Sequence, residues 1–169
     1  MPIRLLLEGR PGAGKTTVAR RLVDLLLRRG VAVTGFTTEE IRQGRRRMGF
    51  AVESVSGERA VMASTSLPGP PRVGKYGVDL DAFERVALPA LSATGDVLVV
   101  DELGKMELAS DRFRDAVARV FDTDVAVVAT VHRFPHPFTD ALKGGHEVIE
   151  VTKESRERLP DRIVDRLTA

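Results

Sequence analysis

The chain has 169 residues, 43% of them hydrophobic and 30% charged, so it can form one well-buried core but not two ordinary domains. Its 26 basic and 24 acidic residues almost balance, so the overall charge does not indicate a nucleic-acid partner. The absence of cysteine excludes disulfides, thiol catalysis and cysteine-ligated zinc. The apolar run at residues 3–7 is much shorter than a signal-peptide core or a membrane span, so we expect a cytoplasmic protein with no membrane partner.

Apolar runs and amphipathic helical patterns alternate along the chain. Strands are predicted at residues 3–7, 31–37, 97–100, 125–131 and 148–151, and helices at residues 15–29, 79–93, 138–143 and 154–167, with a further helix that Ser110 caps. This alternation predicts an α/β protein, a three-layer sandwich whose largely parallel sheet is covered by helices on both faces. We expect residues 1–169 to form a single domain.

Residues 39–63 depart from this alternation. Their second half, MGFAVESVSGERAVMAS, alternates like an antiparallel hairpin that turns at Ser56 and Gly57, and predicts a β insertion. Residues 66–80 are rich in proline and glycine and are predicted to be a surface connection.

The most specific motif lies between the first strand and the first helix. Residues 9–16 read GRPGAGKT and fit the phosphate-binding loop pattern G-x-x-x-x-G-K-[ST]. Glycines let consecutive backbone N–H groups turn toward phosphate oxygens, and the following helix adds the positive end of its dipole. Lys15 would reach the β and γ phosphates of a nucleotide, and the Thr16 hydroxyl would bind Mg²⁺. The sequence therefore predicts a nucleoside triphosphate as ligand.

A second acidic segment complements this loop. The apolar strand at residues 97–100 runs directly into Asp101 and Glu102. Asp101 can orient Mg²⁺, and Glu102 can orient or deprotonate a water that attacks the γ-phosphate. The alternative is that both acids begin a solvated loop. Lys105 lies in the same loop and either stabilises charge on the transferring phosphoryl group or pairs with Glu107 at the surface.

The chain also resembles a known family in blocks more specific than the phosphate loop. These blocks are GRPGAGKTT, GFTTEEIRQGRRRMGFAVESVSGERA, RVGKYGVDL, FERVALPAL, VDELGKMEL and VTKESRERLPDRIV. Together they resemble the small P-loop nucleoside-triphosphatases of thermophiles, whose vertebrate member is the cancer-related nucleoside-triphosphatase. The resemblance implies a RecA-like fold and Mg²⁺-dependent hydrolysis of ATP, GTP and other nucleoside triphosphates with low base selectivity.

The same resemblance assigns two nucleotide-binding segments. The phosphate loop would comprise Gly9, Arg10, Pro11, Gly12, Ala13, Gly14, Lys15, Thr16 and Thr17. The second segment would comprise Val97, Leu98, Val99, Val100, Asp101, Glu102, Leu103 and Gly104, with Lys105 at its end. The metal ligands would be Thr16 and Asp101, and we expect Lys15, Glu102, Lys105 and Arg133 to act in catalysis.

Other candidates rest on position alone. The basic cluster Arg42, Arg45, Arg46 and Arg47 is a lid that brings positive charge to the triphosphate, a nucleic-acid contact, or a solvated turn. Thr130, His132, Arg133 and His136 follow or end a strand at the edge where open α/β sheets bind ligands. Residues 152–156 are candidates for the base side, with Thr152 alternatively the N-cap of the last helix. Tyr76 either stacks on a base or packs in the core.

Two other functions remain compatible with the motifs. A nucleoside or small-molecule kinase would use the same loop to phosphorylate an alcohol, although the Asp101–Glu102 pair suits water. A nucleic-acid-associated ATPase would use the basic cluster to contact a phosphate backbone. We expect the protein to be a monomer.

Overall fold

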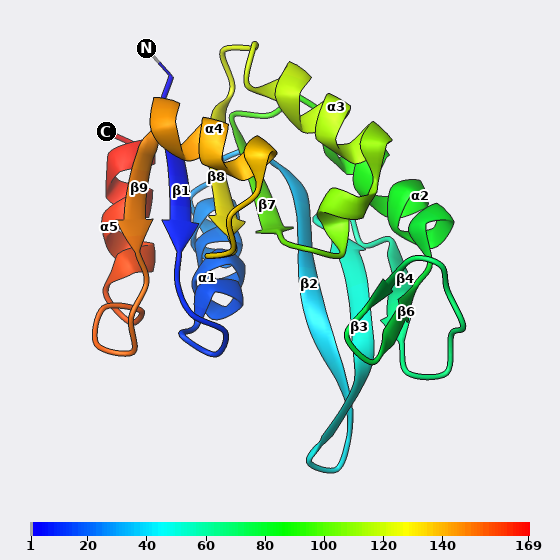
Figure 1. Cartoon of the computed structure of the whole chain (residues 1–169). Coiled ribbons are helices and arrows are strands. Elements are labelled where there is room, and N and C mark those ends of the chain that lie inside the picture. Colours follow the sequence, from blue (N-terminus) through cyan, green and yellow to red (C-terminus); the bar gives the residue numbers. More distant parts are fainter. Residues whose placement is uncertain (1) are drawn as a thin grey trace.

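The computed structural model of the protein describes residues 2–169 around one nine-stranded sheet, ordered β5-β6-β4-β3-β2-β7-β8-β1-β9 (Figure 1). The strands are β1 (Arg4–Glu8), β2 (Val33–Gln43), β3 (Arg46–Ser54), β4 (Arg59–Ser64), β5 (Arg72–Val73), β6 (Tyr76–Val78), β7 (Val97–Leu103), β8 (Ala126–Val131) and β9 (Glu147–Glu150). The helices are α1 (Lys15–Arg28), α2 (Leu80–Ala90), α3 (Asp111–Val120), α4 (Pro137–Gly145) and α5 (Leu159–Leu167), with a short 3₁₀ turn, η1 (Glu107–Ala109).

The parallel half of the sheet contains β2, β7, β8, β1 and β9. Its central strands are apolar because helices cover both of their faces: Leu6 in β1 and Val127 in β8 are fully buried. All five strands point the same way, so their carboxyl ends meet at one edge (Figure 1). This edge brings the loop after β1 close to the ends of β7 and β8.

Helices cover the two faces unequally. Helices α1 and α5 pack on one face through Val18, Leu22 and Ile163, while α2, α3 and α4 cover the other (Figure 1). Three phenyl rings interlock on the second face, because Phe36 of β2 lies 5.7 Å from Phe83 of α2 and 5.8 Å from Phe113 of α3. Each such buried ring contributes about 1.5–3 kcal/mol. The expected three layers are therefore present.

The sheet is mixed, and its antiparallel part is larger than the expected insertion. Four strand pairings are parallel. The other four, β2–β3, β3–β4, β4–β6 and β6–β5, are antiparallel. The antiparallel half begins earlier than residues 39–63, because β2 continues without a break from the parallel core into the β2–β3 hairpin (Figure 1). The proline-rich connection also contributes β5 and β6, which pair by backbone hydrogen bonds that apolar patterning does not reveal.

Helix boundaries show which capping signals were informative. Ser110 caps α3 as predicted, since its hydroxyl accepts a hydrogen bond from the Phe113 N–H at 3.0 Å. The last helix, however, begins at Leu159 rather than near residue 154. Thr152 is not its N-cap: the Thr152 and Ser155 side-chain oxygens accept hydrogen bonds from each other's backbone N–H, which closes a separate turn.

A close backbone approach fixes β2 against β7. Gly35 has φ +115°, and a Cβ there would lie 1.8 Å from the Val99 carbonyl oxygen. We expect Gly35→Ala to lower the free energy of unfolding by roughly 2–6 kcal/mol, from backbone strain plus overpacking. Gly44→Ala is the matched control, because Gly44 also has a positive φ of 62° but a Cβ there meets nothing within 4 Å. Equal losses for both variants in urea unfolding would contradict this account.

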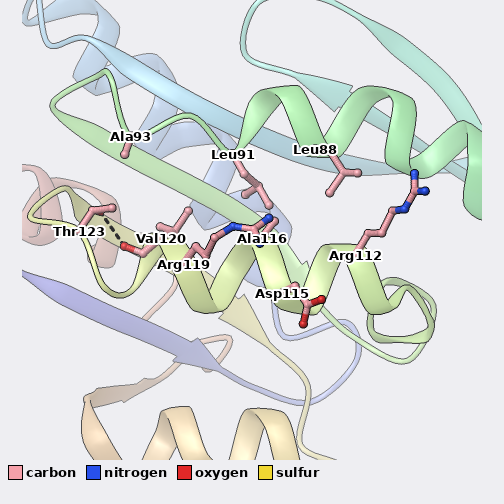
Figure 2. A pocket seen from close by; sticks show the side chains of 9 residues that line it. All are labelled: Leu88, Leu91, Ala93, Arg112, Asp115, Ala116, Arg119, Val120 and Thr123. Carbon is pink, nitrogen blue, oxygen red and sulfur yellow. Dashed lines mark hydrogen bonds between the residues drawn. The ribbon is translucent and has the colours of Figure 1, made fainter.

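A cavity of about 430 Å³ lies between α2 and α3 (Figure 2). It is lined by Leu88, Leu91, Ala93, Arg112, Asp115, Ala116, Arg119, Val120 and Thr123. Because Ala93 and Thr123 precede β7 and β8, this cavity opens near the amino ends of the strands, away from the phosphate loop. Within residues 2–169, every helix is too short or too polar to cross a bilayer.

Candidate active site

The phosphate loop connects β1 to α1 at the carboxyl edge of the sheet, as its motif requires. Gly12 and Gly14 have φ values of 81° and 107°, which other residues rarely adopt. Gly14 is the N-cap of α1 and offers no side chain, so the first backbone N–H groups of the helix lack a side-chain partner. The loop therefore presents free donors and the positive end of a helix dipole, the usual elements of an anion site.

Lys15 links the loop to the acidic segment. Its Nζ donates to the Gly9 carbonyl at 2.8 Å and lies 2.9 Å from the Glu102 carboxylate. The Lys15 side chain is only 11% exposed and that of Glu102 29%, so this ion pair is shielded from water. The structure thus brings together two residues that are 87 positions apart in the chain.

Asp101 is fully buried at the centre of the site. Its Oδ1 accepts hydrogen bonds from the Thr16 hydroxyl at 3.1 Å and from the Thr130 hydroxyl at 2.7 Å. Its Oδ2 accepts from the Thr38 backbone N–H at 3.2 Å and hydroxyl at 3.4 Å. Burial raises the pKa of the Asp101 carboxyl above its ordinary value, and the hydrogen bond from Thr130 partly opposes that rise. The alternative of a solvated loop at Asp101 is therefore wrong.

Glu107 is a second carboxyl beside Glu102. It is 6% exposed, and burial together with the negative charge of Glu102 raises its pKa well above the ordinary value. A Cβ at Gly104 would lie 3.1 Å from the Glu107 Oε1 and 3.3 Å from the Glu102 Oε1, so glycine allows both acids to approach. This burial could not be predicted from local pattern, because η1 turns Glu107 inward only once the chain is folded.

Lys105 and Arg133 lie at the rim of the same region. The Lys105 Nζ is 3.7 Å from the centre of the Phe134 ring, and the proposed surface pair with Glu107 is absent from the described residues 2–169. Arg133 pairs with Glu150 at 3.0 Å and with Glu8 at 3.7 Å. Both cations line the cavity and are held at its rim by contacts with the protein.

The two histidines differ in their surroundings. The His132 Nε2 is 3.1 Å from the Thr139 hydroxyl, and its Nδ1 is the one buried side-chain polar atom within residues 2–169 that lacks a hydrogen-bond partner. Burial lowers the pKa of His132, which favours the neutral ring. His136 instead caps α4, because its Nδ1 accepts a hydrogen bond from the Phe138 N–H at 3.1 Å. His136 therefore has a structural role, and Thr130 contacts Asp101.

The apolar part of the second segment serves a different purpose from direct ligand contact. Val97, Leu98, Val99, Val100 and Leu103 are at most 2% exposed and pack in the core. Their side chains therefore do not line the cavity, and they hold β7 in register so that Asp101 and Glu102 face the phosphate loop. Within this segment, Glu102 and Gly104 are the residues that line the cavity.

A cavity of about 1010 Å³ unites these parts. Its lining from the phosphate-loop side comprises Gly9, Pro11, Gly12, Gly14, Lys15, Thr16, Thr17 and Arg20. Opposite stand Glu102, Gly104, Lys105, Met106, Glu107, His132, Arg133 and Phe134. The β2–β3 hairpin and the β5–β6 turn add Thr38, Glu39, Glu40, Arg42, Arg47, Phe50, Val73, Gly74 and Tyr76. Sequence reasoning missed most of this last wall, because only pairing between distant strands brings it to the site.

A metal ion could be held by oxygen atoms at the centre of this cavity. The Thr16 hydroxyl and the Asp101 carboxylate are 3.1 Å apart, and both are the hard donors that Mg²⁺ prefers. The described part of the chain, residues 2–169, has no cluster of three acidic or histidine side chains suited to a metal. Mg²⁺ sites of this kind usually take their remaining ligands from substrate phosphates and water.

The fold and this site define an α/β protein with a mixed sheet and a phosphate-loop motif opposed by a buried acid. The family model described as NTPase matches residues 4–164, and the chain belongs to this family. The resemblance inferred from the sequence blocks is thereby confirmed.

Relatives of known name align over nearly the whole chain. The Nucleoside-triphosphatase THEP1 of Thermotoga maritima is 39% identical over 167 residues, which cover 96% of this chain and 94% of that protein. The human Cancer-related nucleoside-triphosphatase is 40% identical over 182 residues, which cover 97% and 96%. The crystal structure of THEP1 from the hyperthermophile Aquifex aeolicus superposes with a TM-score of 0.86 at 33% identity and covers 99% of this chain and all of that one (100%).

Proposed function

We propose that the protein is a Mg²⁺-dependent nucleoside-triphosphatase that hydrolyses ATP, GTP and other nucleoside triphosphates to the diphosphate and phosphate. The observation that carries this proposal is the contact between Thr16 at the start of α1 and the buried Asp101 of β7, with Lys15 and Glu102 beside it. The names of the relatives support hydrolysis over the kinase and the nucleic-acid-associated alternatives. The site also supports a RecA-like P-loop assignment for the fold.

The residues of the site divide the work by chemistry. In the proposal, the loop amides hold the phosphates, and Lys15 leaves Glu102 to neutralise the β and γ oxygens. Glu102, freed from its ion pair, then aligns the attacking water and accepts its proton. Lys105 or Arg133 from the rim stabilises charge on the outer phosphate. When bound by Thr16 and Asp101, Mg²⁺ would neutralise charge that develops on the phosphate oxygens.

Low base selectivity follows from the part of the nucleotide that the site engages. The named residues contact only phosphates and metal, which all nucleoside triphosphates share. Residues 152–156 remain candidates for the base side, and Arg156 supports this placement, because its Cδ would lie 2.6 Å from a Cβ at Gly14 in the phosphate loop.

The test is phosphate release measured for the purified protein with ATP, GTP, CTP and UTP, with and without Mg²⁺. We expect release from all four that requires the metal and needs no added acceptor or nucleic acid. A dependence on an added alcohol acceptor would favour a kinase. Stimulation by DNA or RNA that disappears at high salt would favour the nucleic-acid alternative.

Asp101→Asn separates stability from function. A raised pKa in the folded state means that stability from this group is full below the unfolded pKa of about 3.9 and is lost as the pH rises through the folded pKa. We therefore expect Asp101→Asn to be at least as stable as the parent at neutral pH, because the Thr16 and Thr130 hydroxyls can rotate to accept from an amide while Thr38 still donates.

Whereas Asp101→Asn should not lower the stability of the ligand-free protein, it should lower the stabilisation that a bound ligand provides. In the parent, Mg²⁺ with a nucleotide at about 100 times its Kd should add roughly 2.7 kcal/mol to the free energy of unfolding. Asp101→Asn should lose most of this gain in a thermal shift measured with and without Mg-ADP. A variant that keeps the full metal-dependent shift would remove Asp101 from the metal site.

A further inference from the structure

We propose that the arm of the cavity formed by Arg42, Arg47, Phe50 and Tyr76, here termed the hairpin subsite, binds a second small molecule. The ligand it fits carries both a flat aromatic ring and an anionic group, and a nucleoside monophosphate is the simplest molecule of this class. The inference rests on the proposed function, because the position of the triphosphate decides which part of the cavity stays free.

The direction of the triphosphate leaves the hairpin subsite open. The contacts of Thr16 with Asp101 and of Lys15 with Glu102 place the metal and the water-handling group on the β7 side of the phosphate loop. The outer phosphate therefore points toward β7. The next strand beyond β7 is β2, which carries the hairpin (Figure 1). In the proposed binding mode the nucleoside would lie at the other end of the triphosphate, on the side where Arg156 flanks Gly14.

Aromatic side chains from two different segments form one end of the subsite. Phe50 of β3 and Tyr76 of β6 meet edge to face, with ring centres 5.3 Å apart and planes at 73°. Both line the cavity, as does the neighbouring Val73. Tyr76 is only 8% exposed and packs in the core, so the half-buried Phe50 ring is the more accessible of the two. A flat heterocycle packs favourably against such an aromatic edge. This end therefore selects for a ring.

Arginines supply the anionic end. Arg42 and Arg47 each approach the Glu40 carboxylate to 2.6 Å, so two cations share one acid and leave excess positive charge. Both guanidinium groups are half-exposed and line the cavity, and the Arg47 guanidinium also lies 5.6 Å from the centre of the Phe50 ring. Arginine presents several N–H donors in a plane that matches phosphate oxygens. Ring and anion contacts thus lie side by side.

The volume of the cavity leaves room beyond the phosphate-loop end. Sites for single drug-sized ligands measure roughly 300–1,000 Å³. The present cavity, at about 1010 Å³, lies at the top of that range, although the proposed catalytic machinery uses only the end at the phosphate loop. An open arm with both aromatic and cationic walls is better explained by a ligand than by a solvated turn.

The experiment is calorimetric titration of the protein, saturated with Mg-ADP, with AMP, GMP, CMP and UMP. We expect saturable binding of at least one monophosphate, and weaker binding of both adenosine and inorganic phosphate, which carry only the ring or only the anion. Arg47→Ala should weaken binding about tenfold or more, the effect of losing a charge-assisted contact. Arg46→Ala is the matched control, because Arg46 is exposed on the adjacent position but does not line the cavity.

The fluorescence of Tyr76 can show whether a monophosphate binds in the hairpin subsite. It is the one tyrosine of a chain that has no tryptophan, so a monophosphate in the hairpin subsite should change the intrinsic fluorescence of the protein, after correction against free tyrosine amide. Without ADP, the Lys15→Ala variant should bind the monophosphate with a Kd within about threefold of the parent's, also measured without ADP, since the phosphate loop is a separate contact.

Three results would overturn the proposal: no saturable binding, equal loss in the Arg46 and Arg47 variants, or loss of monophosphate binding in Lys15→Ala. The last result would place the monophosphate in the phosphate loop instead. Failure of nucleoside-triphosphate hydrolysis would overturn the proposed function alone, because the titration of Lys15→Ala does not depend on turnover.

Discussion

Glu102→Gln is expected to lower the rate of phosphate release by about 10²- to 10⁴-fold, the usual contribution of a general base. The amide keeps the shape of the side chain but cannot accept the proton of the attacking water. Nucleotide affinity should stay the same or rise, because the ion pair that occupies Lys15 at 2.9 Å is weakened at the same time. The measurements are steady-state phosphate release and ADP binding by calorimetry.

The matched control for this variant is Glu58→Gln, which changes an exposed acid in the turn between β3 and β4. It should release phosphate at the parent rate. If Glu102→Gln also keeps the parent rate, the base is another group, and the neighbouring buried Glu107 becomes the next candidate.

Lys15→Ala is expected to lower kcat/KM by at least about 10²-fold, since one donor aimed at developing charge typically contributes 10²–10³. Unlike the Glu102 variant, it should weaken nucleotide binding as well as turnover, because Lys15 contacts phosphate in the ground state too. The two effects are separated by measuring KM and kcat together with the Kd for Mg-ADP.

Arg85→Ala serves as the control, because Arg85 is an exposed cation of α2 that does not line the cavity. Tight nucleotide binding by Lys15→Ala would contradict the role of the lysine in the phosphate cradle. Urea unfolding of the ligand-free variant, in which Glu102 has lost its partner, measures whether Lys15→Ala also lowers the free energy of unfolding. A loss of activity caused by lower stability alone is recognised in this way.

Local sequence was sufficient for the parts of the site that short segments form by themselves. The loop at residues 9–16 could be recognised because its glycines, lysine and threonine act within one turn between a strand and a helix. Asp101 and Glu102 could be placed because parallel strands end at a common edge. The structure brings these groups together, and their roles in catalysis stay predictions.

Contacts between distant segments could not be predicted in the same way. The inward position of Glu107 depends on η1, and the pairing of Phe50 with Tyr76 depends on β6 joining β4. Periodicity indicates which face of a strand is apolar, but it does not indicate which strand lies next to it. The same gap explains why the antiparallel part of the sheet is larger than expected, since β5 and β6 lie in a segment predicted to be a surface connection.

One strand connects the two ends of the cavity. Thr38 of β2 donates to Asp101, and four residues further along the same unbroken strand Arg42 forms the far wall. Over this stretch β2 is hydrogen-bonded to β3, with a register shift between Ile41 and Arg42, so the pairing of these two strands sets the distance between the walls. Molecules are then selected by their length, and a one-residue insertion in β2 would change which ones fit.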